Sequence, residues 1–468
     1  MNSLVLACAV TRNRLRISVR IACGMSWLWA AILLFVAIAA QAATPLAFPG
    51  AQGWAAHTPG GRGGKILRVT TLAADGPGSL AEAVHAKGPR IVVFEVGGDI
   101  NLGEKTLNID EPFLTIAGQT APSPGITIVR GKGVAINTHD VVVQHIRVRS
   151  GDSGKPKAGG WSTDALRTEA ASDVIIDHCS LYWATNKIIA ASGPRFDGKT
   201  PDEWRAHTAH RITFSNNIVA EALARATHWK IEHSKGALIH DNTTNIAIIG
   251  NLFAHNYERS PLIKGGSRVA LVNNFIYDPG QRAVHYNLIA EEWGSHPYQN
   301  GQLAAVGNVL RAGMSTPLPL AFLEIGGAGD LEYYASDNIA VDKIGQPLPM
   351  LGRYTTSHAR VIEMKDPPLW PEGLKPIPAD EVETSVLTHA GARPWDRDYH
   401  DARVVADVAE GRGWIIDSQE EVHGYLEPKP TQRAFNPADW DLATMLPRRP
   451  ELLDSAAANK TLMVPSSQ

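Results

Sequence analysis

The chain has 468 residues, a formal net charge of −3, 44% hydrophobic residues and 19% charged residues. This composition is ordinary for a folded globular protein, so extensive disorder is excluded. The chain has no excess of positive charge of the kind that nucleic-acid-binding proteins carry. The 42 glycines and 30 prolines indicate many turns.

Residues 1–43 have the pattern of a secretory signal peptide. Four arginines lie between positions 12 and 20, the run Met25–Ala40 is apolar, and Ala40-Gln41-Ala42 fits a small-x-small cleavage site. We therefore expect cleavage after Ala42 or Ala43 and a secreted or periplasmic protein with no stable membrane association. The alternative is an uncleaved membrane anchor, because the apolar run nearly spans a bilayer.

Only one cysteine, Cys179, would remain after cleavage, because Cys8 and Cys23 lie within the signal. The mature chain therefore has no intrachain disulfide to rely on. We expect its stability to come from the core and the backbone ladders of a repeat protein.

The region before residue 90 reads as a cap for a repeating structure. Lys65–Thr70 is a predicted strand, and Ser79–Val84 is a predicted short helix with Ser79 as its N-cap. A stack of repeats needs such a cover, because its first unit would otherwise expose core and backbone edge.

Short β-rich runs follow, first at residues 91–96, 113–116, 126–129, 141–148 and 174–176. Each later run has an apolar segment, a turn ending in Asn and another apolar residue. These asparagines recur at steps of 34, 23, 34 and 30 residues: Asn217, Asn251, Asn274, Asn308 and Asn338. The 23-residue step has the size of one coil of a parallel β-helix, and longer steps are a coil plus a loop.

Asparagine suits such a corner because it tolerates positive φ and its amide can bond stacked neighbours. Ser180 is expected at the same position of an earlier coil. Helical patterns of 10–15 residues do not separate the strands, which disfavours an α/β fold. An antiparallel sandwich would not explain the recurring Asn. The pattern predicts an all-β, right-handed parallel β-helix over residues 44–365, with the short N-terminal capping helix.

Residues 366–468 are predicted to be an irregular C-terminal extension that packs on the β-helix. Asp366–Pro378 is proline-rich, and Tyr399–Val408 reads as one amphipathic helix. Within the repeat region, Thr200-Pro201-Asp202-Glu203 is a capping box with Pro at the first helical position, which predicts a short helix on a loop.

Arg259 and Lys264 place two cations on one small surface of this rigid scaffold. An elongated scaffold can form a groove along a polymer. Together these features indicate an acidic polysaccharide as the binding partner, and we expect the protein to act as a monomer.

The chain resembles the pectate lyase superfamily, specifically family 1 polysaccharide lyases and their bacterial relatives, over roughly residues 48–425. The matching motifs are Phe48–Ala51, Thr58–Gly64, Gly76–Leu80, Ile116–Pro122, Ile176–Ser180, His233–Gly236 and Arg259–Gly266. The resemblance implies a right-handed parallel β-helix that cleaves uronic-acid polymers by β-elimination. Cations or a metal at the sugar carboxylate would stabilise the charge that develops.

The resemblance also implies roles for individual residues. Arg259 matches the arginine that removes the C5 proton, Lys264 the second cation that binds the sugar carboxylate, and Lys235 an upstream groove lysine. The alternative without a catalytic role is that Arg259 is a surface arginine in an exposed salt bridge and that Lys264 and Lys235 are solvated lysines. Asp177 and His178 are expected to be structural residues within the stack.

Calcium is the cofactor that the resemblance implies, with Asp164 as its first aspartate. Relatives place one or two acidic residues on the next strand of the groove, where this chain has Asn186 and Lys187. Either Asp164, Asn186 and the substrate hold the ion, or Lys187 replaces it as a fixed positive charge. We expect some calcium dependence, weaker than in relatives that keep the acidic pair. The alternative for Asp164 is an aspartate with a structural role only.

Three tryptophans, Trp183, Trp204 and Trp229, either stack on sugar rings or fill gaps under loops. The spacings of His207, His210, His228 and His233 match no zinc pattern.

The leading hypothesis is thus an exported pectate lyase-type enzyme acting on α-1,4-linked galacturonan or a related uronan. The alternatives are a lyase for a different acidic glycan and a non-catalytic carbohydrate-binding β-helix. The missing acids at positions 186 and 187 favour the non-catalytic reading, and the Arg259/Lys264 pair argues against it.

Overall fold

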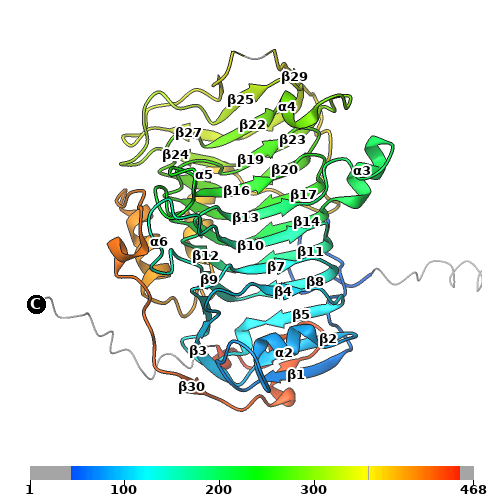
Figure 1. Ribbon diagram of the computed structural model, residues 1–468, viewed down its shortest axis with the longest axis vertical. Helices are drawn as coiled ribbons and strands as arrows, with labels where there is room; N and C mark the ends of the chain where they lie inside the picture. The colour runs from blue at the N-terminus through cyan, green and yellow to red at the C-terminus, as the bar shows by residue number, and fades with distance from the viewer. Residues whose placement is uncertain (1–43, 357, 454–468) are drawn as a thin grey trace, which may run out of the picture. The chain divides into compact units, whose positions relative to one another are not determined.

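A computed structural model describes residues 44–356 and 358–453, so the predicted signal peptide lies outside the described residues. Within that part of the chain, short strands form three long sheets that stack coil upon coil (Figure 1). We call them sheet 1, sheet 2 and sheet 3.

Sheet 1 has eleven strands in the described residues: β1 (Lys65–Val69), β2 (Arg90–Phe94), β5 (Leu114–Ala117), β8 (His139–Gln144), β11 (Ser172–Asp177), β14 (His210–Ser215), β17 (Thr244–Ile249), β20 (Arg268–Val272), β23 (Gly301–Val306), β26 (Leu331–Ser336) and β29 (Val361–Glu363). Sheet 2 has nine: β4 (Leu107–Ile109), β7 (Val134–Ile136), β10 (Asp164–Glu169), β13 (Lys187–Ser192), β16 (Lys235–Ile239), β19 (Leu262–Lys264), β22 (Val284–Leu288), β25 (Leu323–Gly327) and β28 (Leu351–Arg353). Sheet 3 has ten: β3 (Val96–Asn101), β6 (Ile126–Val129), β9 (Ile146–Arg149), β12 (Ser180–Tyr182), β15 (Ile218–Ala220), β18 (Leu252–Ala254), β21 (Phe275–Tyr277), β24 (Val309–Arg311), β27 (Ile339–Val341) and β30 (Thr431–Gln432).

Each coil takes one strand from sheet 1, then sheet 3, then sheet 2, and the next coil pairs in parallel with it, as β11 pairs with β14, β12 with β15 and β13 with β16. Branched apolar side chains such as Ile176, Ile189 and Ile212 fill the interior between the sheets. Buried strands of this composition suit parallel sheets whose inner faces never meet water. The prediction of a right-handed parallel β-helix is confirmed.

The recurring asparagines form one continuous ladder at the corner between sheet 1 and sheet 3. The amide oxygen of Asn251 accepts from the backbone N and the side-chain Nδ2 of Asn217, each at 2.9 Å. Asn274, Asn308 and Asn338 continue the same pattern, one coil at a time. Each amide satisfies buried backbone groups that would otherwise cost about 1–3 kcal/mol each. The predicted equivalence of these five positions is confirmed.

The expectation for Ser180 is wrong by one residue. The backbone N of Cys179, rather than of Ser180, donates to Asn217 Oδ1 at 2.8 Å, and Ser180 already pairs with Ile218 as the first residue of β12. The buried, unpaired thiol of Cys179 therefore occupies the corner position of that coil.

Helices lie at the cap and outside the coils. Helix α2 (Leu80–His85) has the predicted Ser79 cap, α3 (Pro201–His207) has the predicted capping box, and α6 (Tyr399–Ala409) matches the predicted amphipathic helix. Helix α4 (Ala290–Trp293) and helix α5 (Ala379–His389) were not predicted.

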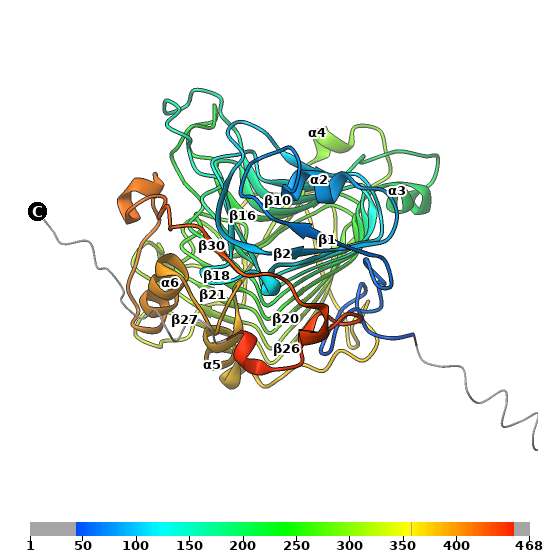
Figure 2. The same ribbon diagram turned by 90° about the horizontal axis from the view of Figure 1, so that it is seen from below.

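The C-terminal extension covers the outer face of sheet 3. Val382 of α5 and Val404 of α6 join the same apolar cluster as Ile218 and Phe275 of that sheet, and Figure 2 shows both helices beside β18, β21 and β27. Strand β30 then pairs antiparallel with β3 of the first coils. In the part of the chain that the structure describes, the apolar cluster that contains α5 and α6 includes no residue of sheet 2. Across residues 44–356 and 358–453, none of the helices is both long and apolar enough to cross a membrane.

Candidate active site

Charged residues occupy one register position along sheet 2. Asp164, Lys187 and Lys235 are the first residues of β10, β13 and β16, and Asp164 pairs with Lys187, which pairs with Lys235. Because strands in a parallel sheet lie about 4.7–4.9 Å apart, their side chains form a row along the β-helix axis.

The same register extends the row by two further coils. Leu238 pairs with Leu262, which aligns Lys235 with Arg259, and Leu262 pairs with His285, which aligns Arg259 with Arg282. We call these five residues the charge ladder: Asp164, Lys187, Lys235, Arg259 and Arg282. Four cations and one carboxylate thus project from successive coils of the sheet that α5 and α6 leave uncovered.

Glu258 holds the upper part of the charge ladder together. Its carboxylate lies 2.9 Å from Lys235 Nζ and 3.7 Å from Arg259 Nε, and it also pairs with Arg282. Burial raises the pKa of Glu258, but the neighbouring cations more than offset this and hold the pKa below its usual range. An ionised carboxylate therefore fixes three cations and leaves them with excess positive charge.

Arg259 lies in an unusual environment for an arginine. Its side chain is mostly buried, Nε has no hydrogen-bond partner, and Glu258 is its ion-pair partner among the described residues. Burial lowers the pKa of the guanidinium below its ordinary value, against the raising effect of Glu258. The chain turns here with Arg259 at φ 67°, and a Cβ on Gly236 would lie 2.5 Å from the Arg259 carbonyl oxygen. Glycine at 236 therefore lets the Arg259 turn approach β16 closely.

Lys264 lies apart from the charge ladder, at the opposite end of β19. Its ammonium is 3.1 Å from Asp241 Oδ2 and also pairs with Glu292, and both carboxylates contact Arg195 as well. Two cations and two carboxylates balance each other in this group. The structure thus places Lys264 in the same sheet as Arg259 but not in the same ion-pair cluster.

Asp164 and Asn186 lie next to each other, yet their oxygens are engaged. Asn186 Nδ2 donates to Asp164 Oδ1 at 2.9 Å, and Lys187 Nζ lies 3.2 Å from Asp164 Oδ2. The Asn186 oxygen faces His233 Nε2 at 3.0 Å. Burial lowers the pKa of His233 to about 3, so the ring is neutral and Nε2–H is the donor.

This arrangement does not fit a calcium ion. Calcium takes six to eight oxygen ligands, whereas the Asp164 carboxylate here meets an ammonium and an amide NH₂. In the part of the chain that the structure describes, three or more His, Cys, Asp or Glu side chains do not come together as a metal site. Two cations already lie beside Asp164: the Lys187 ammonium at 3.2 Å and the Arg167 guanidinium at 3.8 Å, both measured to Oδ2.

The three tryptophans differ in environment. Trp183 is buried against His400 and Tyr425, and Trp204 is buried against Phe196, so both fill gaps under loops. Trp229 is 65% exposed.

Trp229 ends a row of stacked rings that starts beside the charge ladder. His233, which contacts Asn186, stacks on His228 with ring centroids 3.9 Å apart, and His228 stacks on Trp229 at 5.6 Å. Of the three tryptophans, Trp229 is the one whose ring is exposed.

Sequence reasoning missed Arg282, Glu258 and His233 as members of the site. A signal for Arg282 exists, because it follows Arg259 by 23 residues, the one-coil step that also separates Asp164 from Lys187. Asp177, which the resemblance implies to be structural, accepts hydrogen bonds from Ser215 of β14 and from Asn216, which directly follows that strand, away from the charge ladder.

Comparison with known proteins identifies the family. The chain is 32% identical over 381 residues to a protein of Aspergillus fumigatus named "Probable pectate lyase C", covering 81% of each chain. It is also 32% identical over 399 residues to the protein of the same name from Neosartorya fischeri, covering 84% of this chain and 85% of the relative. No family model matches the sequence.

Among solved structures, the fold is similar to that of Jun a 1, the major allergen from cedar pollen, with a TM-score of 0.52 and 15% identity over 73% of this chain and 92% of that one. At that identity the likeness concerns the fold alone. The fungal relatives carry the assignment of family: the chain belongs to the pectate lyase family and is a polysaccharide lyase of the pectate lyase type.

Proposed function

We propose that the protein is an exported lyase that cleaves α-1,4-linked galacturonan (pectate) or a related uronan by β-elimination, with Arg259 as the base. The observation that carries the proposal is the charge ladder, with cations on four successive coils of the uncovered sheet. A row of positive charge along the β-helix axis is complementary to a polymer with a carboxylate on every sugar. The signal-like pattern of residues 1–43 supports export.

Arg259 supplies the general base in this proposal. β-Elimination moves the C5 proton beside the sugar carboxylate to neutral Arg259 and breaks the C4–O bond. The leaving glycosidic oxygen takes up a proton from solvent, and a double bond forms between C4 and C5. An ordinary guanidinium is a poor base because it stays protonated. Burial disfavours the charged form of the Arg259 guanidinium. The positive charges of the adjacent Lys235 and Arg282 act in the same direction, because they disfavour a third positive charge at this point.

The neighbouring cations stabilise the charge that develops on the substrate. When the C5 proton leaves, negative charge spreads into the carboxylate as an enolate, and fixed cations at that place lower the barrier. Lys235 and Arg282 flank Arg259 on the ladder, Lys187 lies one coil beyond Lys235, and these three cations would take this role. Lys264 would provide a further contact for the polymer at the other edge of sheet 2, with its charge balanced by Asp241 and Glu292.

We further propose that Lys187 takes the place of calcium as a fixed positive charge. The support is the ammonium 3.2 Å from Asp164 and the engagement of the Asn186 oxygen by His233. Asp164 then orients Lys187 and is not a metal ligand. Calcium would then not be required at this place, which goes further than the weaker calcium dependence that the sequence alone predicts.

The proposal is tested by incubating the purified protein with a panel of uronan polymers and following the absorbance of the unsaturated product. We expect absorbance to grow with polygalacturonate or with one related uronan, which would also identify the acidic glycan. Binding of uronans without any unsaturated product would instead favour a non-catalytic carbohydrate-binding protein.

The rate should rise as pH rises into the alkaline range. The active form of Arg259 is neutral, and below its pKa the neutral fraction increases tenfold per pH unit. The lowered pKa of Arg259 brings this rise closer to neutral pH. Burial also lowers the pKa of Lys235, so loss of its proton limits the rise at the alkaline end. Measurements of kcat/KM from about pH 6 to about pH 10, with circular dichroism to confirm folding, should follow this profile; a maximum on the acidic side would contradict an arginine base.

Trp229 should contribute to polymer binding. A sugar that covers part of the exposed ring removes apolar surface from water at about 25 cal/mol per Å², so Trp229→Ala should raise KM about two- to tenfold with little change in kcat. Trp414 is 56% exposed but lies on the C-terminal extension, so Trp414→Ala is the matched control. Equal KM values for the two variants would remove Trp229 from the groove.

A further inference from the structure

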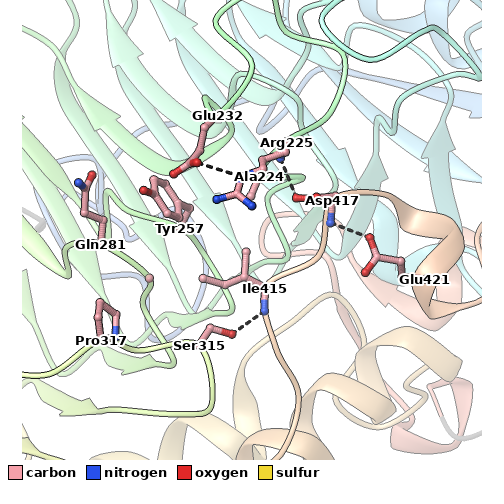
Figure 3. Close-up of a pocket in the computed structure, with 11 residues that line it drawn as sticks. Ala224, Arg225, Glu232, Tyr257, Gln281, Ser315, Pro317, Ile415, Asp417 and Glu421 are labelled. Carbon is pink, nitrogen blue, oxygen red and sulfur yellow. Dashed lines mark hydrogen bonds and ion pairs between the residues drawn. The ribbon is translucent and has the colours of Figure 1, made fainter.

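A cavity lies between the loops next to the charge ladder and the C-terminal extension. It measures about 400 Å³, within the range of about 300–1,000 Å³ that is common for small-molecule sites. One side comes from loops that lead from sheet 3 into sheet 2, including Arg225, Glu232 and Tyr257, and the other side from Ile415 and Asp417 of the C-terminal extension (Figure 3).

The Tyr257 ring separates this pocket from the charge ladder. Lys235 Nζ lies 4.6 Å from the centroid of that ring, and Tyr257 directly precedes Glu258 and Arg259 in the chain. The loop before β16 also contributes to both the pocket and the surroundings of the charge ladder. Glu232 lines the pocket, and His233 contacts Asn186 beside the ladder. The Tyr257 side chain thus contacts the charge ladder through Lys235 and also lines the pocket.

The charge of the pocket is opposite to that of the ladder. Three acidic residues, Glu232, Asp417 and Glu421, line it together with Arg225, whose Nε lies 2.9 Å from Glu232 Oε2. Lys157 pairs with Asp417 at 3.6 Å, and the acids still outnumber these two cations. Such a lining repels a uronate. Carboxylates accept hydrogen bonds from sugar hydroxyls, and the Tyr257 ring and Ile415 supply apolar surface.

We propose that this pocket binds a neutral sugar branch of the acidic polysaccharide whose backbone occupies the charge ladder. The proposal rests on the proposed lyase function and adds a specificity to it. The enzyme would cleave a uronan that carries neutral side chains faster than the same uronan without them, because the branch contributes binding at the pocket.

The test uses one branched acidic polysaccharide and the same material after enzymatic removal of its neutral side chains. Ile415→Trp fills the pocket from the C-terminal extension, and Pro317→Trp blocks it from its exposed rim in case the first variant does not fold. Ile344→Trp makes the same change as the first variant at a side chain that is 73% exposed outside the pocket. Circular dichroism confirms folding of each variant.

We expect the wild type and Ile344→Trp to show a severalfold higher kcat/KM on the branched polymer. The two pocket variants should lose that preference and keep the wild-type rate on the debranched polymer. Equal kcat/KM of the wild type on both polymers, or an equal loss on both in the pocket variants, would overturn the proposal.

Calorimetric titration with the released neutral oligosaccharides separates this proposal from the proposed function. Binding to the wild type and to Ile344→Trp, but not to Ile415→Trp, is the expected result, and absence of binding to the wild type would overturn the pocket. If neither polymer yields unsaturated product, the lyase function fails, and the titration still decides whether the pocket takes a neutral sugar.

Discussion

Arg259→Lys should lower kcat on the polymer substrate by about 10²–10⁴-fold, the usual cost of losing a general base. Lysine keeps a positive charge but not the planar, multi-donor geometry of the guanidinium. A lysine ammonium in the same place would also pair with Glu258 and stay protonated. The loss should therefore appear in kcat with KM changed little, measured by the initial rate of absorbance of the unsaturated product.

Arg360→Lys provides the control for this variant, because Arg360 has a 78% exposed side chain paired with Asp330, outside sheet 2. Its kcat should equal that of the wild type. Circular dichroism should show the same fold for both variants. An Arg259→Lys enzyme with wild-type turnover would mean that another group removes the C5 proton.

Lys187→Ala should lower kcat by about 10²–10³-fold, the range for removal of one fixed electrostatic stabiliser. The variant would remove the ammonium beside Asp164 but leave the Asn186 amide bonded to it. Added calcium should not restore the rate, because one carboxylate and an engaged amide do not make a calcium site. Lys65→Ala is the matched control, since Lys65 is also the first residue of a strand but lies in sheet 1.

The double variant Asn186→Asp/Lys187→Asp tests the same position by gain of function. It places two further carboxylates beside Asp164, which is the oxygen-rich set that calcium prefers. We expect this enzyme to be inactive with chelator and to regain activity when calcium is added. Full activity of Lys187→Ala without any metal would show that neither the ammonium nor an ion at this place is needed.

The fold followed from the sequence because a β-helix repeats its local rules. Every coil needs an apolar run, a corner and another apolar residue. The spacing between the corner residues Asn251 and Asn274 therefore indicates the length of one coil. Helix α5 escaped prediction because Pro378 precedes it without a side-chain cap and few apolar residues, such as Val382 and Val386, face the sheet. Ser180 was misplaced because a cysteine stands where later coils have asparagine.

The site followed from the sequence only where its residues share the coil register. Asp164, Lys187, Lys235 and Arg259 could be named individually, and the 23-residue step could have added Arg282. The partners of Lys264 could not be found this way. Asp241 and Glu292 come from the loops between sheet 2 and sheet 1, whose lengths vary from coil to coil, so no spacing predicts that they meet.

The most direct measurement is the initial rate of unsaturated-product formation by the wild type on the uronan that the polymer panel identifies, stripped of calcium, with and without excess chelator. A β-eliminating enzyme that uses Lys187 as its fixed cation should give the same rate in both conditions, and added calcium should not raise it. Loss of activity with chelator and its recovery at micromolar calcium would contradict this account.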